Sequence, residues 1–124
     1  MTTYRELLQQ TKTEINELDA REAQDVADAH WIDVREADEW QEGHLPGAVH
    51  VPLAQLAARA AELLGDDRPL VVHCQGGSRS SIAAAYLQPL LREVGRPAAH
   101  NLVGGYGEWA RRGMPVDGGA KPGA

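Results

Sequence analysis

Residues 71–82 have the sequence VVHCQGGSRSSI and place the only cysteine of the chain, Cys74, between two different hydrophobic patterns. Before it, residues 69–73 form a short apolar run that contains β-branched residues, which predicts a buried strand. After it, the alanine-rich residues 80–91 predict a helix. The segment between them is therefore a tight loop at the carboxyl end of a strand, where open α/β sheets place their active sites.

This predicted loop favours a negatively charged sulfur at Cys74. Gly76 and Gly77 can adopt positive φ angles without steric cost, so consecutive backbone N–H groups can point inward. The positive end of the helix dipole acts in the same direction, as does Arg79 if its side chain turns inward. Because the thiolate is the reactive form of cysteine, we expect Cys74 to have a lowered pKa and to act as a nucleophile rather than as an inert core residue.

Two further motifs flank the loop in sequence. The first is IDVRE (residues 32–36), with Glu39-Trp40 and GHLPGA (43–48), and the second is LVGGY (102–106), with Trp109 and GMPV (113–116). Together with the Cys74 loop, these segments resemble the motifs of the rhodanese homology domain, a sulfurtransferase family. The resemblance covers about residues 15–116.

The resemblance implies an α/β fold: a single rhodanese-like domain with a mainly parallel central sheet flanked by helices on both faces. It also implies that the loop cysteine takes sulfane sulfur from a donor as a persulfide and passes it to a thiol or cyanide acceptor. Cys74 would hold the persulfide, and Arg79, with Arg35 as the weaker candidate, would favour an anionic donor such as thiosulfate. The loop residues that would surround the donor are Gln75, Gly76, Gly77, Ser78, Arg79 and Ser80.

Three polar residues of the first motif have a mainly structural interpretation. Asp33 and Arg35 are two positions apart at a strand end and share a face, so we expect a partly buried ion pair that positions the following loop, in preference to contact with substrate. The resemblance assigns His44 to holding a chain turn, in preference to base catalysis.

His73 adjoins Cys74, but neighbours at a strand end point to opposite sides, so no Cys–His dyad is expected. The remaining histidines lack metal-ligand spacing, and we expect no metal and no cofactor.

Composition limits the kind of protein. A chain of 124 residues with 43% hydrophobic and 24% charged residues fits one soluble domain, and its net charge of −6 argues against nucleic acid as a partner. No apolar run approaches the length that spans a bilayer and no secretory signal is evident, so we expect no membrane association and a cytoplasmic location. With no second cysteine, an external acceptor is needed, such as cyanide, glutathione, thioredoxin or a sulfur-carrier protein.

The chain divides into three predicted parts: a helical extension over residues 1–14, the domain over residues 15–116, and a disordered glycine-rich tail over residues 117–124. Within the domain, Asp19 is a suitable N-cap for a helix that continues through Ala29. Pro89 lies inside the helix after the loop, where we expect a bend or a second short helix.

Three other functions have to be weighed against the residues of the Cys74 loop. A Cys-x₅-Arg phosphatase also holds an anion in a cysteine-led loop, but the position that its arginine would occupy is Ser80 here, and Arg79 comes one residue early. We therefore expect no useful phosphatase activity. A non-catalytic binding or regulatory module is less consistent with an intact Cys74 loop. A sulfur carrier that is loaded by a protein persulfide is equally compatible with these residues.

Overall fold

A five-stranded parallel sheet forms the centre of the molecule, with the strand order β1-β5-β4-β2-β3. The computed structural model describes Thr3 and residues 15–118. The strands are β1 (Asn16–Leu18), β2 (His30–Asp33), β3 (Val49–His50), β4 (Leu70–His73) and β5 (His100–Leu102). Strand β4 lies in the middle of the sheet, so the segment that leaves its carboxyl end is surrounded by neighbouring strands.

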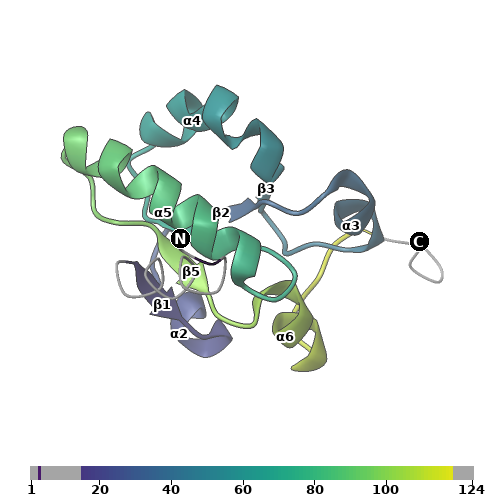
Figure 1. Cartoon of the computed structure of the whole chain (residues 1–124). Coiled ribbons are helices and arrows are strands. Elements are labelled where there is room, and N and C mark those ends of the chain that lie inside the picture. Colours follow the sequence, from purple (N-terminus) through teal and green to yellow (C-terminus); the bar gives the residue numbers. More distant parts are fainter. Residues whose placement is uncertain (1–2, 4–14, 119–124) are drawn as a thin grey trace.

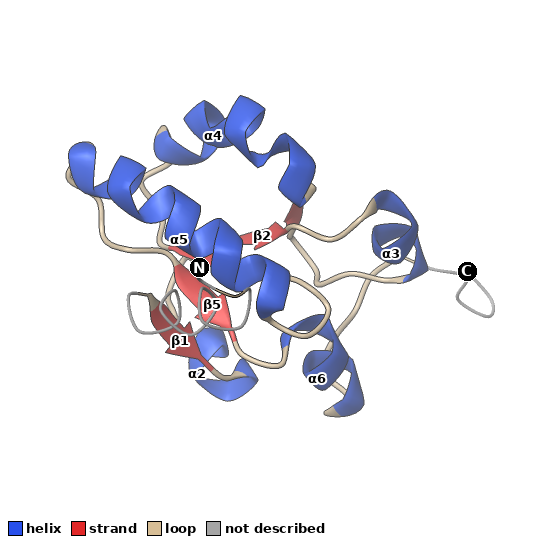
Figure 2. Cartoon of the chain, in the orientation of Figure 1, coloured by secondary structure: helices blue, strands red, loops and turns tan. Residues whose placement is uncertain are grey.

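Helices cover both faces of this sheet (Figure 1). They are α2 (Ala20–Gln24), α3 (Ala37–Glu42), the 3₁₀ helix η1 (Leu53–Gln55), α4 (Leu56–Leu64), α5 (Ser78–Glu93) and α6 (Gly105–Arg111). Figure 2 shows α4 and α5 on one side of the strands and α2 and α6 on the other. The predicted α/β class, with a parallel sheet between two helical layers, is confirmed.

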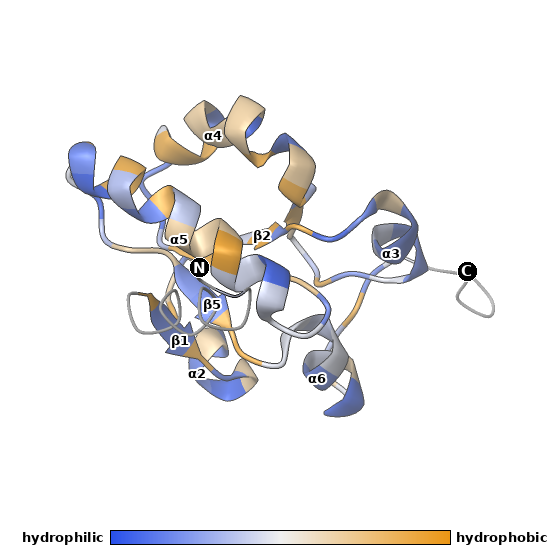
Figure 3. Ribbon diagram, viewed as in Figure 1, coloured by the Kyte–Doolittle hydropathy of each residue, from blue (hydrophilic) through white to orange (hydrophobic). Residues whose placement is uncertain are grey.

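The alternation of side chains along β4 divides the core into two parts. Val72 packs in a cluster with Leu87 of α5, whereas Val71 packs in a second cluster with Trp109 of α6. Successive residues of a strand point to opposite faces, so one buried strand supplies both clusters. In Figure 3, α4 is coloured mainly as hydrophobic, α5 alternates between hydrophobic and hydrophilic segments, and α3 carries mostly hydrophilic residues. No helix among residues 15–118 is long and apolar enough to cross a membrane.

Helix α2 is shorter than predicted. Asp19 caps it as expected, since its side chain accepts a hydrogen bond from Glu22 N, but the helix ends at Gln24 and not at Ala29. The N–H of Asp25 bonds to Glu22 O, and Asp28 has a φ of 55°, in the left-handed region. This turn ends the helix and lets the chain enter β2.

Helix α5 is continuous through Pro89, and the predicted second helix does not form between Ser78 and Glu93. Proline removes one backbone hydrogen bond, but Pro89 is exposed and lies one turn from Ala85 on a surface that also includes Arg92. A carbonyl on the solvent side of a helix can bind water instead, which allows the helix to continue.

The predicted domain boundaries can be compared with the structure only in part. Asp117, the first residue of the predicted tail, pairs antiparallel with His44 through backbone bonds of 2.7 and 2.8 Å. The ordered chain therefore extends past Val116. Residues 119–124 and, apart from Thr3, the predicted extension over residues 1–14 lie outside the described residues.

Candidate active site

Cys74 lies directly after β4, with 1% of its surface exposed. Helix α5 begins at Ser78, two residues earlier than predicted, so the connecting loop is short. Gly77 has a φ of 111°, which turns its N–H onto the Cys74 sulfur at an N···Sγ distance of 3.0 Å. Gln75, Gly76 and Ser78 are exposed around this buried sulfur, so the loop forms the rim of the candidate site.

The loop stabilises the thiolate form of Cys74. Burial alone would raise the pKa of the thiol, but hydrogen bonds from the Ser80 hydroxyl and from the N–H groups of Ser80, Gly77 and Gly76 outweigh burial, and the pKa is lowered. The Ser80 Oγ lies 3.4 Å from the sulfur. This is the direction that the sequence predicts for a nucleophilic cysteine.

A buried polar network behind Ser80 was missed by the sequence analysis. Ser80 Oγ lies 2.6 Å from Asn101 Oδ1, so this oxygen shares the one hydroxyl hydrogen of Ser80 with the Cys74 sulfur. Asn101 Nδ2 donates to Ser81 Oγ at 3.0 Å and to Glu17 Oε2 at 3.1 Å. Asn101 is 1% exposed on β5. A polar side chain in the middle of a short buried strand was the available signal, since such a group needs partners to be buried.

Helix α6 holds the other side of the loop through backbone contacts. The N–H groups of Tyr106 and Gly107 donate to the carbonyl oxygens of Cys74 and Gln75 at 2.8 and 3.0 Å. A Cβ atom at Gly105 would lie only 2.4 Å from Cys74 O. Gly105, the second glycine of LVGGY, is therefore required for this close approach of α6 to the loop.

Arg35 lies beneath the loop in a buried ion pair. Its guanidinium bonds to both carboxylate oxygens of Asp33 at 2.9–3.1 Å, to Gly43 O at 2.6 Å and to Gln75 Oε1 at 3.2 Å. It also lies over the ring of Tyr106, 4.2 Å from the centroid. Arg35 is 1% exposed, so the pair is fully rather than partly buried, and Arg35 contacts the loop through Gln75.

His73 faces away from the candidate site. Its Nε2 lies 3.4 Å from Asp33 Oδ2, a longer contact than those of Arg35, which makes Arg35 the closer partner of the carboxylate. Burial alone would raise the pKa of Asp33, but the close approach of His73 and the hydrogen bonds from Arg35 hold that pKa well below its usual range. The side chains of His73 and Cys74 thus belong to separate environments.

Arg79 has a carboxylate partner that the sequence analysis did not anticipate. Its two terminal nitrogens bond to the two carboxylate oxygens of Glu39 on α3, at 2.7 and 2.9 Å. The hydrogen bond to Glu39 raises the pKa of the Arg79 guanidinium, and the nearby Cys74 sulfur contributes in the same direction. Arg79 therefore lies between a carboxylate and the candidate nucleophile.

His44 contacts neighbouring chain segments. Its Nδ1 lies 2.9 Å from Trp40 O, its ring stacks on the Trp40 ring at 3.5 Å, and its backbone pairs with Asp117. These contacts agree with a role in holding the chain turn. Within residues 15–118, no cluster of three or more His, Cys, Asp or Glu side chains could hold a metal ion.

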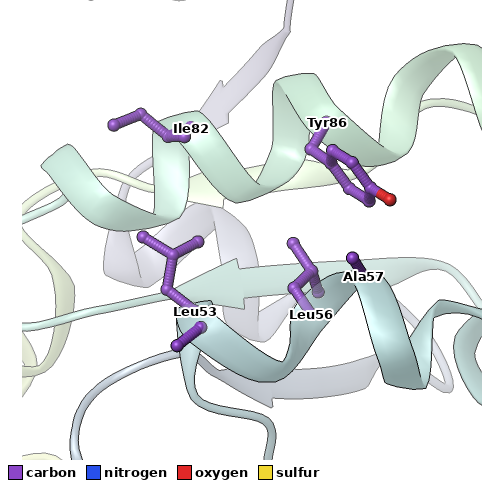
Figure 4. Close-up of a pocket in the computed structure, with 6 residues that line it drawn as sticks. Leu53, Leu56, Ala57, Ile82 and Tyr86 are labelled. Atoms are coloured by element: carbon purple, nitrogen blue, oxygen red, sulfur yellow. The ribbon is translucent and has the colours of Figure 1, made fainter.

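A groove lies between η1, α4 and α5 and has a volume of about 180 Å³ (Figure 4). Its lining residues are apolar or aromatic: Leu53, Ala54, Leu56, Ala57, Ile82 and Tyr86. The groove does not include Cys74 and offers few polar groups to an anion. The loop around Cys74 is therefore the better candidate for chemistry.

The sequence of the chain matches the rhodanese-like domain family over residues 11–112, and the chain belongs to that family. It is 33% identical over 106 residues to a sulfurtransferase of Allochromatium vinosum, covering 82% of this chain and 94% of that protein. It is 42% identical over 92 residues to the HTH-type transcriptional regulator Rv0324 of Mycobacterium tuberculosis, covering 74% of this chain but only 39% of the regulator.

Solved structures share the fold. A thiosulfate sulfurtransferase from Pseudomonas aeruginosa superposes with a TM-score of 0.73 at 32% identity, over 90% of this chain and 22% of that chain. A protein of unknown function from Rhodopseudomonas palustris, described as a possible tyrosine phosphatase, gives a TM-score of 0.76 at 25% identity, over 93% and 94% of the two chains. Both sulfur and phosphoryl chemistry therefore have to be weighed at the Cys74 loop.

Removal of the Ser80 hydroxyl should raise the pKa of Cys74, because the thiolate loses one of its hydrogen-bond donors. The rate of alkylation by iodoacetamide, measured against pH, should show its midpoint at higher pH in Ser80→Ala than in the wild type. Ser78→Ala is the matched control, since Ser78 is exposed in the same turn, and its midpoint should stay with the wild type. Coincident profiles for Ser80→Ala and the wild type would contradict this role of Ser80.

Replacement of Arg35 by methionine should destabilise the fold by about 3–5 kcal/mol near neutral pH, because it leaves the Asp33 carboxylate buried without its partner. The folded-state pKa of Asp33 is lowered, so its contribution is present above the ordinary aspartate pKa and is lost as the pH falls below it. The urea midpoints of the two proteins should therefore converge in acid. Arg111→Met, at an arginine with 75% side-chain exposure, should not shift the midpoint.

Proposed function

We propose that this rhodanese-like domain is a sulfurtransferase in which Cys74 carries the sulfur. The observation that supports this most directly is the convergence of the Gly77 N–H and the Ser80 hydroxyl on the buried Cys74 sulfur at the start of α5. A thiolate is stabilised there without a neighbouring base. This suits sulfur transfer, in which the attacking group is already an anion and the leaving group is a stabilised anion.

The proposed reaction has two displacement steps. In the first, the Cys74 thiolate attacks the sulfane sulfur of thiosulfate; the new S–S bond forms on Cys74, and sulfite leaves with the electron pair of the broken bond. In the second, cyanide or a thiolate attacks the outer sulfur of the Cys74 persulfide and regenerates the Cys74 thiolate. Negative charge stays at the loop throughout, where Gln75, Gly76, Gly77, Ser78, Arg79 and Ser80 would surround the donor.

The acceptor must come from outside the chain. Cys74 is its only cysteine, so no second thiol of the chain can resolve the persulfide. Glutathione, thioredoxin or a sulfur-carrier protein would serve, with cyanide as a laboratory acceptor. A free, reactive thiol of this kind suits a reducing compartment, and a cytoplasmic location is part of the proposal.

A second candidate is a carrier that receives sulfur from a protein persulfide, with thiosulfate only as a surrogate. The pairing of Arg79 with Glu39 favours this version, because it reduces the attraction for a small anion. Sulfur loading from thiosulfate can be compared with loading from a cysteine desulfurase. A strong preference for the protein donor would exclude thiosulfate as the working substrate.

Phosphatase activity is not proposed, despite the likeness to a possible tyrosine phosphatase. In a Cys-x₅-Arg loop the arginine binds phosphate oxygens in a bidentate manner. Here that position is Ser80, which is buried against Cys74, while Arg79 already binds both oxygens of Glu39.

Intact-protein mass spectrometry tests the proposed function. After brief incubation with thiosulfate, the wild type should gain one sulfur atom, and cyanide or dithiothreitol should remove it. Cys74→Ser should gain none, because it lacks the thiolate that attacks the donor.

A wild type that gains no sulfur from thiosulfate or from a desulfurase would refute the proposed function and favour a binding or regulatory module. An aryl phosphate serves as the second substrate in the same experiment. Turnover of that phosphate by the wild type, lost in Cys74→Ser, would instead favour the phosphatase assignment.

A further inference from the structure

The two arginines that approach the Cys74 loop are both bound to carboxylates. Arg35 is buried against Asp33, and Arg79 forms a bidentate pair with Glu39. Each pair is close to neutral as a unit. The positive charge that the sequence predicts for attracting an anionic donor is therefore largely compensated before any donor arrives.

Glu39 is fixed in position from two sides. Its Oε1 accepts from the backbone N–H of Glu36 at 3.0 Å, as part of the cap of α3, and the same oxygen accepts from Arg79. Both side chains of the Arg79–Glu39 pair are only partly exposed, 33% and 27% respectively. The pair is thus a prearranged part of the rim and not a chance contact between two mobile surface chains.

An anionic donor that uses Arg79 has to compete with the Glu39 carboxylate for the same nitrogen atoms. Thiosulfate carries two negative charges, so it loses most from this competition and from repulsion by Glu39. A donor with at most one negative charge depends less on Arg79 and is less affected.

We propose that Glu39 determines donor specificity at this site by occupying Arg79, and that it selects sulfur donors of low charge, such as a thiol persulfide, against small dianions. This inference rests on the proposed function. With a persulfide donor, the Cys74 thiolate attacks the outer sulfur of R–S–SH. A new S–S bond forms between Cys74 and this sulfur, which gives the Cys74 persulfide, and the thiolate RS⁻ leaves with the electron pair of the broken S–S bond. The donor needs no free arginine for this step.

The test compares two donors that present the same sulfane sulfur but different charge: thiosulfate, a dianion, and methanethiosulfonate, a monoanion that releases methanesulfinate. The kcat/KM ratio of thiosulfate to methanethiosulfonate, with cyanide as acceptor, should rise about three- to fivefold in Glu39→Gln, the scale of one exposed ion pair. Glutamine keeps an oxygen that can accept from Glu36 N, so the cap of α3 is preserved.

Glu42→Gln is the matched control, because it removes the same charge from the same helix at an exposed position, whereas the ion pair of Arg79 is with Glu39. Its donor ratio should stay with the wild type. The rise in Glu39→Gln should shrink at high salt, since the Arg79 interaction is partly exposed to solvent. An unchanged or lower ratio in Glu39→Gln would overturn the proposal, and a lower one would show that Glu39 holds Arg79 in a productive position.

Binding of an inert dianion separates this inference from the proposed function. Sulfate should protect Cys74 from iodoacetamide at a severalfold lower concentration in Glu39→Gln than in the wild type, whether or not sulfur is transferred. Equal protection would overturn the role of Glu39. If the wild type takes sulfur from neither donor, the sulfurtransferase proposal fails, and the sulfate measurement alone decides whether Glu39 controls access of anions to Arg79.

Discussion

The hydrogen bond from the Gly77 N–H to the Cys74 sulfur is the contact on which the rest of the site depends. A charged sulfur at a position with 1% exposure would be costly without donors directed at it. Gly77 supplies one because its φ of 111° turns the chain sharply between β4 and α5. That turn also brings the first residues of α5 next to the sulfur, so the dipole of the helix and the Ser80 hydroxyl act on the same atom.

The neighbouring strands and helices hold this turn in place. Asn101 from β5 binds Ser80, Arg35 after β2 binds Gln75, and the N–H groups at the start of α6 bind the loop carbonyls. Because β4 is central in the sheet, partners reach its carboxyl end from both sides. The three sequence motifs, although far apart along the chain, thus meet around the Cys74 loop.

Charge around the site is balanced within the protein itself. Asp33 neutralises a buried arginine beneath the loop, while Glu39 neutralises Arg79 at its rim. The first pair is structural, since its loss leaves a buried charge. The second is partly exposed at the rim, and we infer that its strength influences which donors bind the arginine.

The sequence by itself determined the strand–loop–helix position of Cys74 and the association of Asp33 with Arg35, because these rest on local periodicity and on residues two positions apart. It also determined the α/β class, through the three motifs that resemble the rhodanese homology domain. It mispredicted the end of α2, because a left-handed turn at Asp28 is not visible in a linear pattern. Of its two expectations at Pro89, the second short helix is wrong, because α5 continues through the proline on its exposed side. Only the tertiary structure decided the partners of Ser80 and Arg79. Asn101 and Glu39 lie 21 and 40 positions away from them, and sheet order and helix packing bring them together.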